Sequence, residues 1–125
     1  MTDRHAYVVA VETPRAACPV AGVAVLEEGR TIGTGRASAS TLNLALVMSA
    51  ERAVELGAQP GSVLVIHLQS ADAIAALAGE KPCREPLAGL VARVAPRLGD
   101  LVIPHFDPAP AIGYELAQRA AMEAA

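Results

Sequence analysis

Hydrophobic residues in the first third of the chain follow the period of two that is typical of β-strands. The pattern predicts strands over residues 6–12, 20–26 and 31–38, with turn and proline residues between them. Short connections of this kind favour an antiparallel meander. Gly33 and Gly35 interrupt the third segment, so we expect that strand at a sheet edge or beside a bulge.

The rest of the chain alternates between helical spacing and short apolar runs. Ser40 and Thr41 are suited to cap a helix, and Leu42, Leu46 and Ala50 recur at helical spacing after them. The whole pattern predicts helices over residues 41–56, 71–78, 87–98 and 112–124, and strands over residues 62–68 and 101–106. The run 62–68 is almost wholly apolar, which predicts a central strand buried on both faces.

This order of elements predicts a single α/β domain over residues 1–125. A meander followed by strand–helix–strand units gives a mixed five-stranded sheet, in which three antiparallel strands precede parallel ones. Right-handed crossovers then place helices on both faces of the sheet.

Composition narrows the classes of function. Apolar residues make up 53% of the 125 residues and aromatic residues only 2%, so the core must be built from Val, Leu, Ile and Ala. The net charge is −3, with one lysine and nine scattered arginines, which disfavours strong non-specific binding to nucleic acid.

The cysteines and the lengths of the apolar runs bear on the compartment of the protein. Cys18 and Cys83 are far apart without metal-binding spacing, so we interpret them as two reduced thiols. We find neither an apolar run of the roughly 20 residues that span a bilayer nor a leader pattern. We therefore expect a cytoplasmic protein, a monomer or a homodimer, that does not enter the membrane.

Local sequence resembles the ribonuclease H family at three places. These are the last helix with its preceding strand and histidine loop, the first long helix around Ala50-Glu51-Arg52-Ala53-Val54, and the segment from Val65 to Asp72. Together with the order of elements, they make the chain similar to type 1 ribonuclease H over nearly its whole length. The resemblance implies the ribonuclease H-like fold. It also implies hydrolysis of the RNA strand of RNA–DNA hybrids by four carboxylates that hold two Mg²⁺ or Mn²⁺ ions.

The resemblance carries the catalytic positions onto Glu12, Asn43, Gln69 and Tyr114, of which only Glu12 is a carboxylate. Such a site carries a charge of about −1 where two dications call for about −4, so we expect two-metal binding to fail and no cofactor to be held. A shifted alignment returns Asp72 or Asp107 as further metal ligands beside Glu12, but not a full set.

The three histidines differ in their expected roles. His105 is the best candidate for a functional group, because the resemblance places it in a loop whose histidine assists proton transfer. His67 lies in an apolar strand, and we expect it to be a hydrogen-bonded interior residue. His5 precedes the first strand, and we expect it to be solvated.

Two main hypotheses for function remain. The first is a catalytically inactive interaction module that binds a protein or a nucleic acid through the former substrate groove or a sheet edge. The second is an altered metal-dependent ribonuclease that uses Glu12, Asp72, Asp107 and His105. The number of carboxylates favours the first. A small-molecule binder is a third hypothesis, which requires a different topology.

Overall fold

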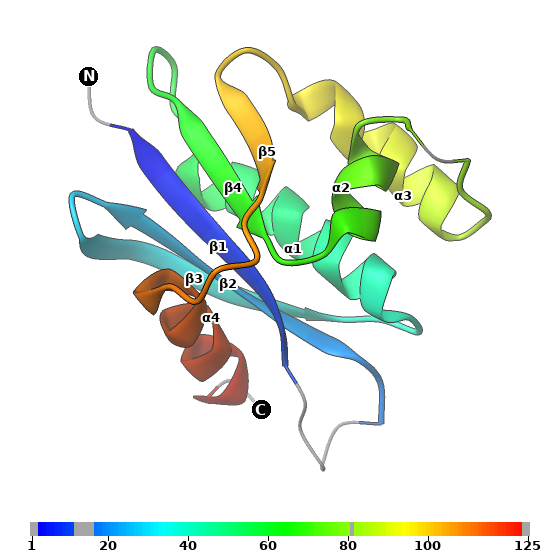
Figure 1. Ribbon diagram of the computed structural model, residues 1–125, viewed down its shortest axis with the longest axis horizontal. Coiled ribbons are helices and arrows are strands. Elements are labelled where there is room, and N and C mark those ends of the chain that lie inside the picture. Colours follow the sequence, from blue (N-terminus) through cyan, green and yellow to red (C-terminus); the bar gives the residue numbers. More distant parts are fainter. Residues whose placement is uncertain (1–2, 12–16, 81, 124–125) are drawn as a thin grey trace.

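The computed structural model describes residues 3–11, 17–80 and 82–123. These residues form one mixed sheet with the strand order β3-β2-β1-β4-β5 (Figure 1). Its strands are β1 (Arg4–Val11), β2 (Val20–Glu27), β3 (Arg30–Ser38), β4 (Leu64–Leu68) and β5 (Val102–Phe106). β1 pairs antiparallel with β2, and β2 with β3, whereas β1–β4 and β4–β5 are parallel. The predicted mixed sheet is confirmed.

Helices cover both faces of this sheet, as predicted. They are α1 (Leu42–Gly57), α2 (Ala71–Leu77), α3 (Leu87–Val94), which continues as a 3₁₀ turn (Ala95–Arg97), and α4 (Ile112–Glu123). In Figure 1, α4 crosses in front of the sheet and α1 lies behind it. α1 contacts α2 and α3. The main contacts of α4 are with β1, β2 and β3.

Local side chains set the helix boundaries. The Thr41 hydroxyl accepts a hydrogen bond from the Leu44 N–H at 3.3 Å, and Ser70 accepts one from the Ala73 N–H at 3.2 Å. Both serve as N-caps, which satisfy backbone donors that lack a partner in the first turn. The third helix is shorter than predicted, because Pro96 has no N–H with which to continue it.

β4 is a central strand, as predicted, and all of its residues except Val65 are buried. The strand that is most completely buried on both faces is β2. Every residue from Val20 to Leu26 is buried, because α1 covers one face of β2 and α4 the other. On β4, Val65 is only half-buried, since α4 does not extend over that part of the sheet. Val9 of β1 and Leu116 of α4 are also half-buried, and both pack against the cluster of Ala24, Leu26 and Ala117.

A glycine allows α4 to approach β2 closely. A Cβ atom at Gly22 of β2 would overlap the carbonyl oxygen of Ala117, so only glycine lets α4 pack this near.

β3 is an edge strand, as expected, and its pairing with β2 shifts register between Val25 and Leu26.

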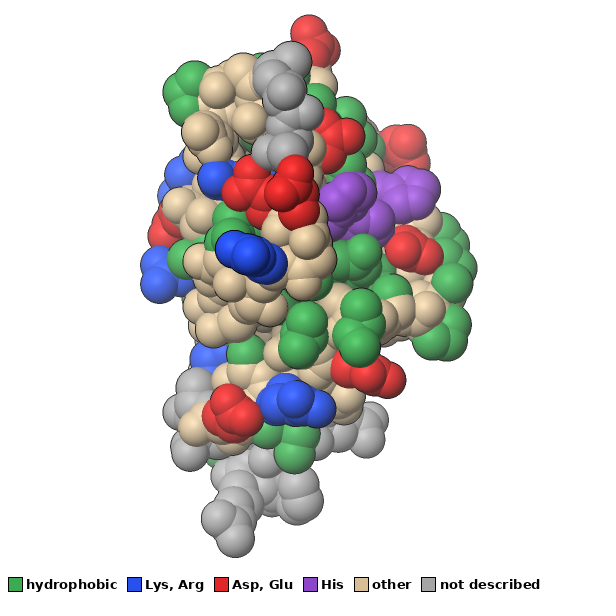
Figure 2. Space-filling model, turned by 90° about the vertical axis from the view of Figure 1, so that its left-hand side faces the viewer, with side chains coloured by type: hydrophobic (Ala, Val, Ile, Leu, Met, Phe, Trp, Pro, Cys, Tyr) green, Lys and Arg blue, Asp and Glu red, His purple; other side chains and the backbone are tan. Residues whose placement is uncertain are grey.

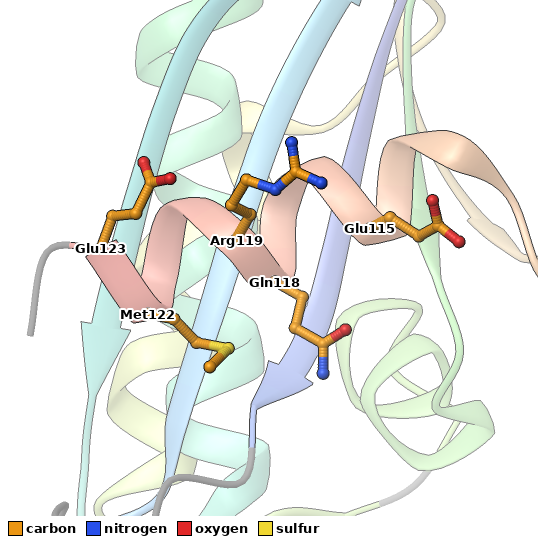
Figure 3. Close-up of a pocket in the computed structure, with 5 residues that line it drawn as sticks. All are labelled: Glu115, Gln118, Arg119, Met122 and Glu123. Atoms are coloured by element: carbon orange, nitrogen blue, oxygen red, sulfur yellow. The ribbon is translucent and has the colours of Figure 1, made fainter.

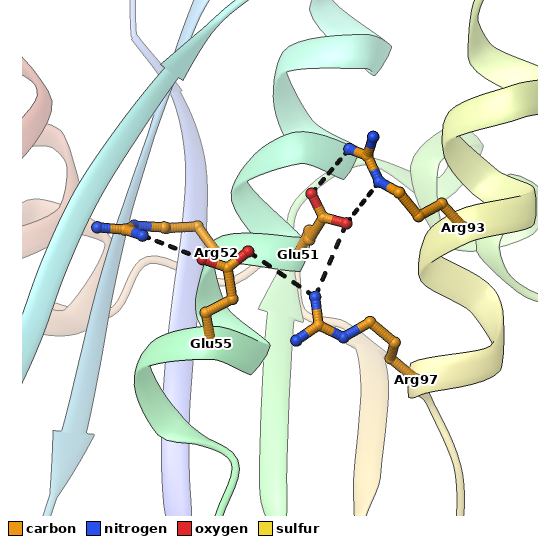
Figure 4. Close-up of polar contacts among 5 residues, drawn as sticks. All are labelled: Glu51, Arg52, Glu55, Arg93 and Arg97. Carbon is orange, nitrogen blue, oxygen red and sulfur yellow. Dashed lines mark hydrogen bonds and ion pairs between the residues drawn. The ribbon is translucent and has the colours of Figure 1, made fainter.

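Ion pairs join α1 to α3 on the surface of the helical layer (Figure 4). Glu51 accepts two hydrogen bonds from the Arg93 guanidinium, both at 2.8 Å, and its carboxylate lies 3.8 Å from Arg97. Glu55 pairs with Arg52 at 3.0 Å and with Arg97 at 3.8 Å. Because Glu51 is mostly covered and holds Arg93 with both oxygens, it is the centre of this network.

Leu46→Ala tests the predicted core face of α1. Leu46 is 3% exposed, so removing its methyl groups should lower the free energy of unfolding by about 2–5 kcal/mol in urea titrations. Leu42, which is 44% exposed on the same helix, is the matched control. Equal losses for Leu46→Ala and Leu42→Ala would contradict the assigned face.

Glu51→Gln tests the link between α1 and α3. It should lower the melting temperature more than Glu55→Gln does, because only Glu51 makes a bidentate pair between elements. Added salt should shrink the difference. If the two variants melt alike at low salt, the network contributes nothing specific to α1–α3 packing.

Candidate functional site

Three histidines gather on the part of the sheet that α4 leaves open. His5 and Tyr7 alternate to the same face of β1, and Tyr7 lies opposite His67 on β4. His67 in turn lies opposite His105 on β5. Figure 2 shows the histidine side chains together at one place on the surface.

Hydrogen bonds connect two of these histidines to one carboxylate. His5 Nδ1 lies 2.9 Å from His67 Nε2, and His67 Nδ1 lies 3.2 Å from Asp107 Oδ2. An ionised carboxylate only accepts, so His67 Nδ1 carries the proton that is donated to Asp107. In the neutral pair His67 Nε2 must then accept from the Nδ1–H of His5. The result is a directed chain, His5 to His67 to Asp107.

Asp107 is itself fixed from several sides. Its N–H donates to the Leu68 carbonyl at 2.8 Å, and its Oδ1 accepts from the Ala109 N–H at 3.3 Å. The Tyr114 hydroxyl donates to the Asp107 carbonyl at 2.8 Å. Asp107 thus joins the end of β4, the loop after β5 and the first turn of α4.

Aromatic rings fill the space between α4 and the histidines. The Tyr7 ring stacks on His67 with centroids 4.4 Å apart and 6° between the planes, and Tyr114 meets Tyr7 edge-on at 5.1 Å. A Cβ atom at Gly113 would overlap the Tyr7 ring, so a glycine is needed there. Burial, and then the charge of Asp107, raises the pKa of both tyrosines, which stay protonated as donors.

The environment favours the neutral form of His67. Burial lowers the pKa of His67, and the neighbouring His5 and His105 lower it further. The hydrogen bond and charge of Asp107 act in the opposite direction without reversing the shift. At neutral pH His67 is therefore an uncharged imidazole whose orientation is set by a carboxylate.

The structure separates the predicted site residues into groups. Asn43 and Asp72 line one shallow depression of about 290 Å³, together with Ala76, Pro82, Cys83, Arg84 and Leu87. Gln69 is exposed between β4 and α2. Tyr114 is 5% exposed and lies with Asp107 beside the histidines. Glu12 falls outside the described residues.

The expectations for the histidines had mixed outcomes. His67 is a hydrogen-bonded interior residue, as expected, and His105 is exposed with its ring edge-on to His67 at 5.7 Å. The prediction that His5 is solvated was wrong: it is half-buried and hydrogen-bonded, because β1 begins at Arg4 and carries it onto the sheet. The period of two places His5 with Tyr7, but the pairing with β4 is what brings it to His67.

A larger depression lies along the outer face of α4 (Figure 3). Its lining residues, Glu115, Gln118, Arg119, Met122 and Glu123, all come from this one helix, and their side chains leave it in different directions. Groups that diverge do not assemble around a ligand. This depression is therefore a weaker candidate than the histidine face.

Metal sites and membrane spans were both sought within the described ranges. There, no three His, Cys, Asp or Glu side chains form a group that could hold a metal ion. No helix in that part of the chain is long and apolar enough to cross a membrane.

The arrangement of strands and helices matches solved ribonuclease H structures. Ribonuclease H1 from Halobacterium salinarum NRC-1 superposes with a TM-score of 0.75 at 21% identity, covering 98% of this chain and 96% of that one. LC11-RNase H1, isolated from compost by a metagenomic approach, gives 0.72 at 18% identity and covers 99% of both chains. The chain has the ribonuclease H fold.

This ribonuclease H-like fold is shared with more divergent structures. The N-terminal RNase H domain of rv2228c from Mycobacterium tuberculosis gives a TM-score of 0.67 at 15% identity, over 99% of this chain and 94% of that chain. LC11-RNase H1 has also been solved in complex with an RNA/DNA hybrid. No family model and no curated protein matches the sequence. The predicted fold is confirmed.

The lowered pKa of His67 predicts a pH dependence of stability. The unfolded chain takes up a proton near the ordinary histidine pKa of about 6.5, before the folded state does. The contribution of His67 to the free energy of unfolding should therefore be complete above that pH and should decrease as the pH falls below it. Urea titrations across this range, with chelator present, measure the slope.

His67→Gln is the informative variant for this dependence, and His105→Gln is its control. Loss of His67 should flatten the slope, whereas His105 is exposed and should leave most of it. An unchanged slope in His67→Gln would show that other groups cause the acid sensitivity.

Proposed function

We propose that this ribonuclease H-like chain is a binding module that does not hydrolyse RNA–DNA hybrids by the two-metal mechanism. Tyr114 is the observation that carries the proposal. Its position matches that of the acid that opens the last helix in the family, yet its side chain is buried and donates to the Asp107 carbonyl. A side chain that is hydrogen-bonded in this way stabilises the loop, and its hydroxyl does not act as a metal ligand.

Charge supports the same conclusion. Asn43 and Gln69 offer neutral amide oxygens at two further matched positions, and only Glu12 keeps an acid. Two divalent ions at close range need several anionic oxygens to offset their charge. Asp107 lies beside Tyr114, but both of its carboxylate oxygens already accept hydrogen bonds, from His67 and Ala109.

One observation favours an altered nuclease as the second candidate. Asp72 lines the same depression as Asn43, so an acid does lie near one matched position. The altered nuclease would use Glu12, Asp72 and Asp107 as metal ligands, with His105 assisting proton transfer. It would still hold fewer anionic ligands than a two-metal site needs.

An assay of hybrid cleavage tests the proposal. Wild-type protein should release RNA fragments from a labelled RNA–DNA hybrid in Mg²⁺ or Mn²⁺ no faster than buffer does, because loss of a single catalytic group already costs orders of magnitude. An active type 1 ribonuclease H in the same buffer is the positive control. Fluorescence anisotropy on the same hybrid measures binding separately.

The outcomes divide the hypotheses. Binding without cleavage supports a nucleic-acid partner, and neither binding nor cleavage supports a protein partner. Cleavage that disappears in Asp72→Asn or Glu12→Gln, while Glu55→Gln remains active, would overturn the proposal in favour of the altered nuclease. Glu55 is a suitable control because it lies at the far end of α1 from Asn43.

A further inference from the structure

We propose that His5 and His67 form a site for one late transition-metal ion, Zn²⁺, Ni²⁺ or Cu²⁺, on the open face of the sheet. The ion would replace the hydrogen bond between His5 Nδ1 and His67 Nε2. This inference uses residues other than those matched to the hydrolytic positions, so it does not depend on the proposed function.

The distance between the two nitrogens is close to what such an ion requires. Zn²⁺ binds imidazole nitrogen at about 2.0–2.1 Å with tetrahedral angles, which separates two nitrogen ligands by about 3.3 Å. His5 Nδ1 and His67 Nε2 are already 2.9 Å apart. The two nitrogens would separate by a few tenths of an ångström, and both rings would turn within the site so that their lone pairs meet at an ion beside the line that joins the nitrogens. His5 is half-buried.

His67 is held in the manner of a metal ligand before any ion binds. Its Nδ1–H donates to Asp107, which leaves the Nε2 lone pair directed at His5. Carboxylate–histidine pairs of this type orient the ring and increase its basicity toward metals. Stacking on Tyr7 at 4.4 Å fixes the plane of the ring as well.

The chemistry of the donors selects the ion. Neutral imidazole suits zinc, copper and nickel, whereas Mg²⁺ and Mn²⁺ prefer oxygen ligands. His5 must move its proton from Nδ1 to Nε2, a change of tautomer with no net proton release. The described residues supply two nitrogen ligands at this point, and water completes the coordination.

The surroundings agree with an ion at this point. Asp107 supplies negative charge, while His105 and the protonated Tyr7 are the other titratable groups in ring contact with His67. The histidines reach the surface in Figure 2, which gives an ion a path from solvent.

Calorimetric titration of tag-free protein with Zn²⁺ tests the site. A Cys18→Ser, Cys83→Ser background removes the two cysteine thiols, neither of which forms a disulfide, as competing ligands. We expect one ion per chain and a rise in melting temperature with Zn²⁺, but no rise with Mg²⁺ at the same concentration. With Cu²⁺, the electron paramagnetic resonance spectrum should show coupling to two imidazole nitrogens.

Variants assign the ligands. His5→Gln should abolish binding, and Asp107→Asn should weaken it by about 10–100-fold through His67. His105→Gln is the matched control and should bind as the background protein does. Absence of Zn²⁺ binding, unchanged binding in His5→Gln, or an equal loss in His105→Gln would overturn the proposal. If His5→Gln does not fold, a copper spectrum of the background protein without two nitrogen couplings would do so.

Discussion

The hydrogen bonds of Asp107 organise the open face of this molecule. One residue accepts from His67 and Ala109 through its carboxylate, donates to Leu68 through its backbone, and accepts from Tyr114 through its carbonyl. These bonds set where the loop after β5 ends and how α4 begins. They also fix the tautomer of His67 and, through it, the proton on His5. Without its carboxylate, the imidazole of His67 and the N–H of Ala109 would each lose a partner, which is costly for the buried imidazole.

A shared fold does not determine the chemistry of the residues that it brings together. Its sheet order and crossovers bring β1, β4 and the start of α4 together, which is where the family resemblance places acids. Among the described residues, this region holds two tyrosines, imidazoles and the carboxylate of Asp107, which already accepts hydrogen bonds. The fold determines which segments meet, and the side chains at the meeting point determine what they can bind.

Periodicity in the sequence was enough to predict the elements, their order and the mixed sheet. The apolar positions of α1 and α4 fall on one face only in a helix, and the short apolar run of β2 fits a strand. Periodicity did not predict which strand is covered twice, since that depends on how far α4 extends over the sheet. The contact of His5 with His67 was also missed. It depends on the pairing of β1 with β4, which joins residues 62 positions apart. Likewise, no local pattern indicates that Tyr114 bonds to Asp107.

The central claim is that Asp107 directs the protons of the histidine face. Nitrogen-15 correlation spectra of the imidazole rings at neutral pH, recorded with chelator, measure those protons directly. The account predicts that His67 carries its proton on Nδ1 in the wild-type protein, and that Asp107→Asn disturbs this preference while a variant of the distant Glu55 does not. A His67 ring protonated on Nε2 alone, or the same tautomer in Asp107→Asn, would contradict it.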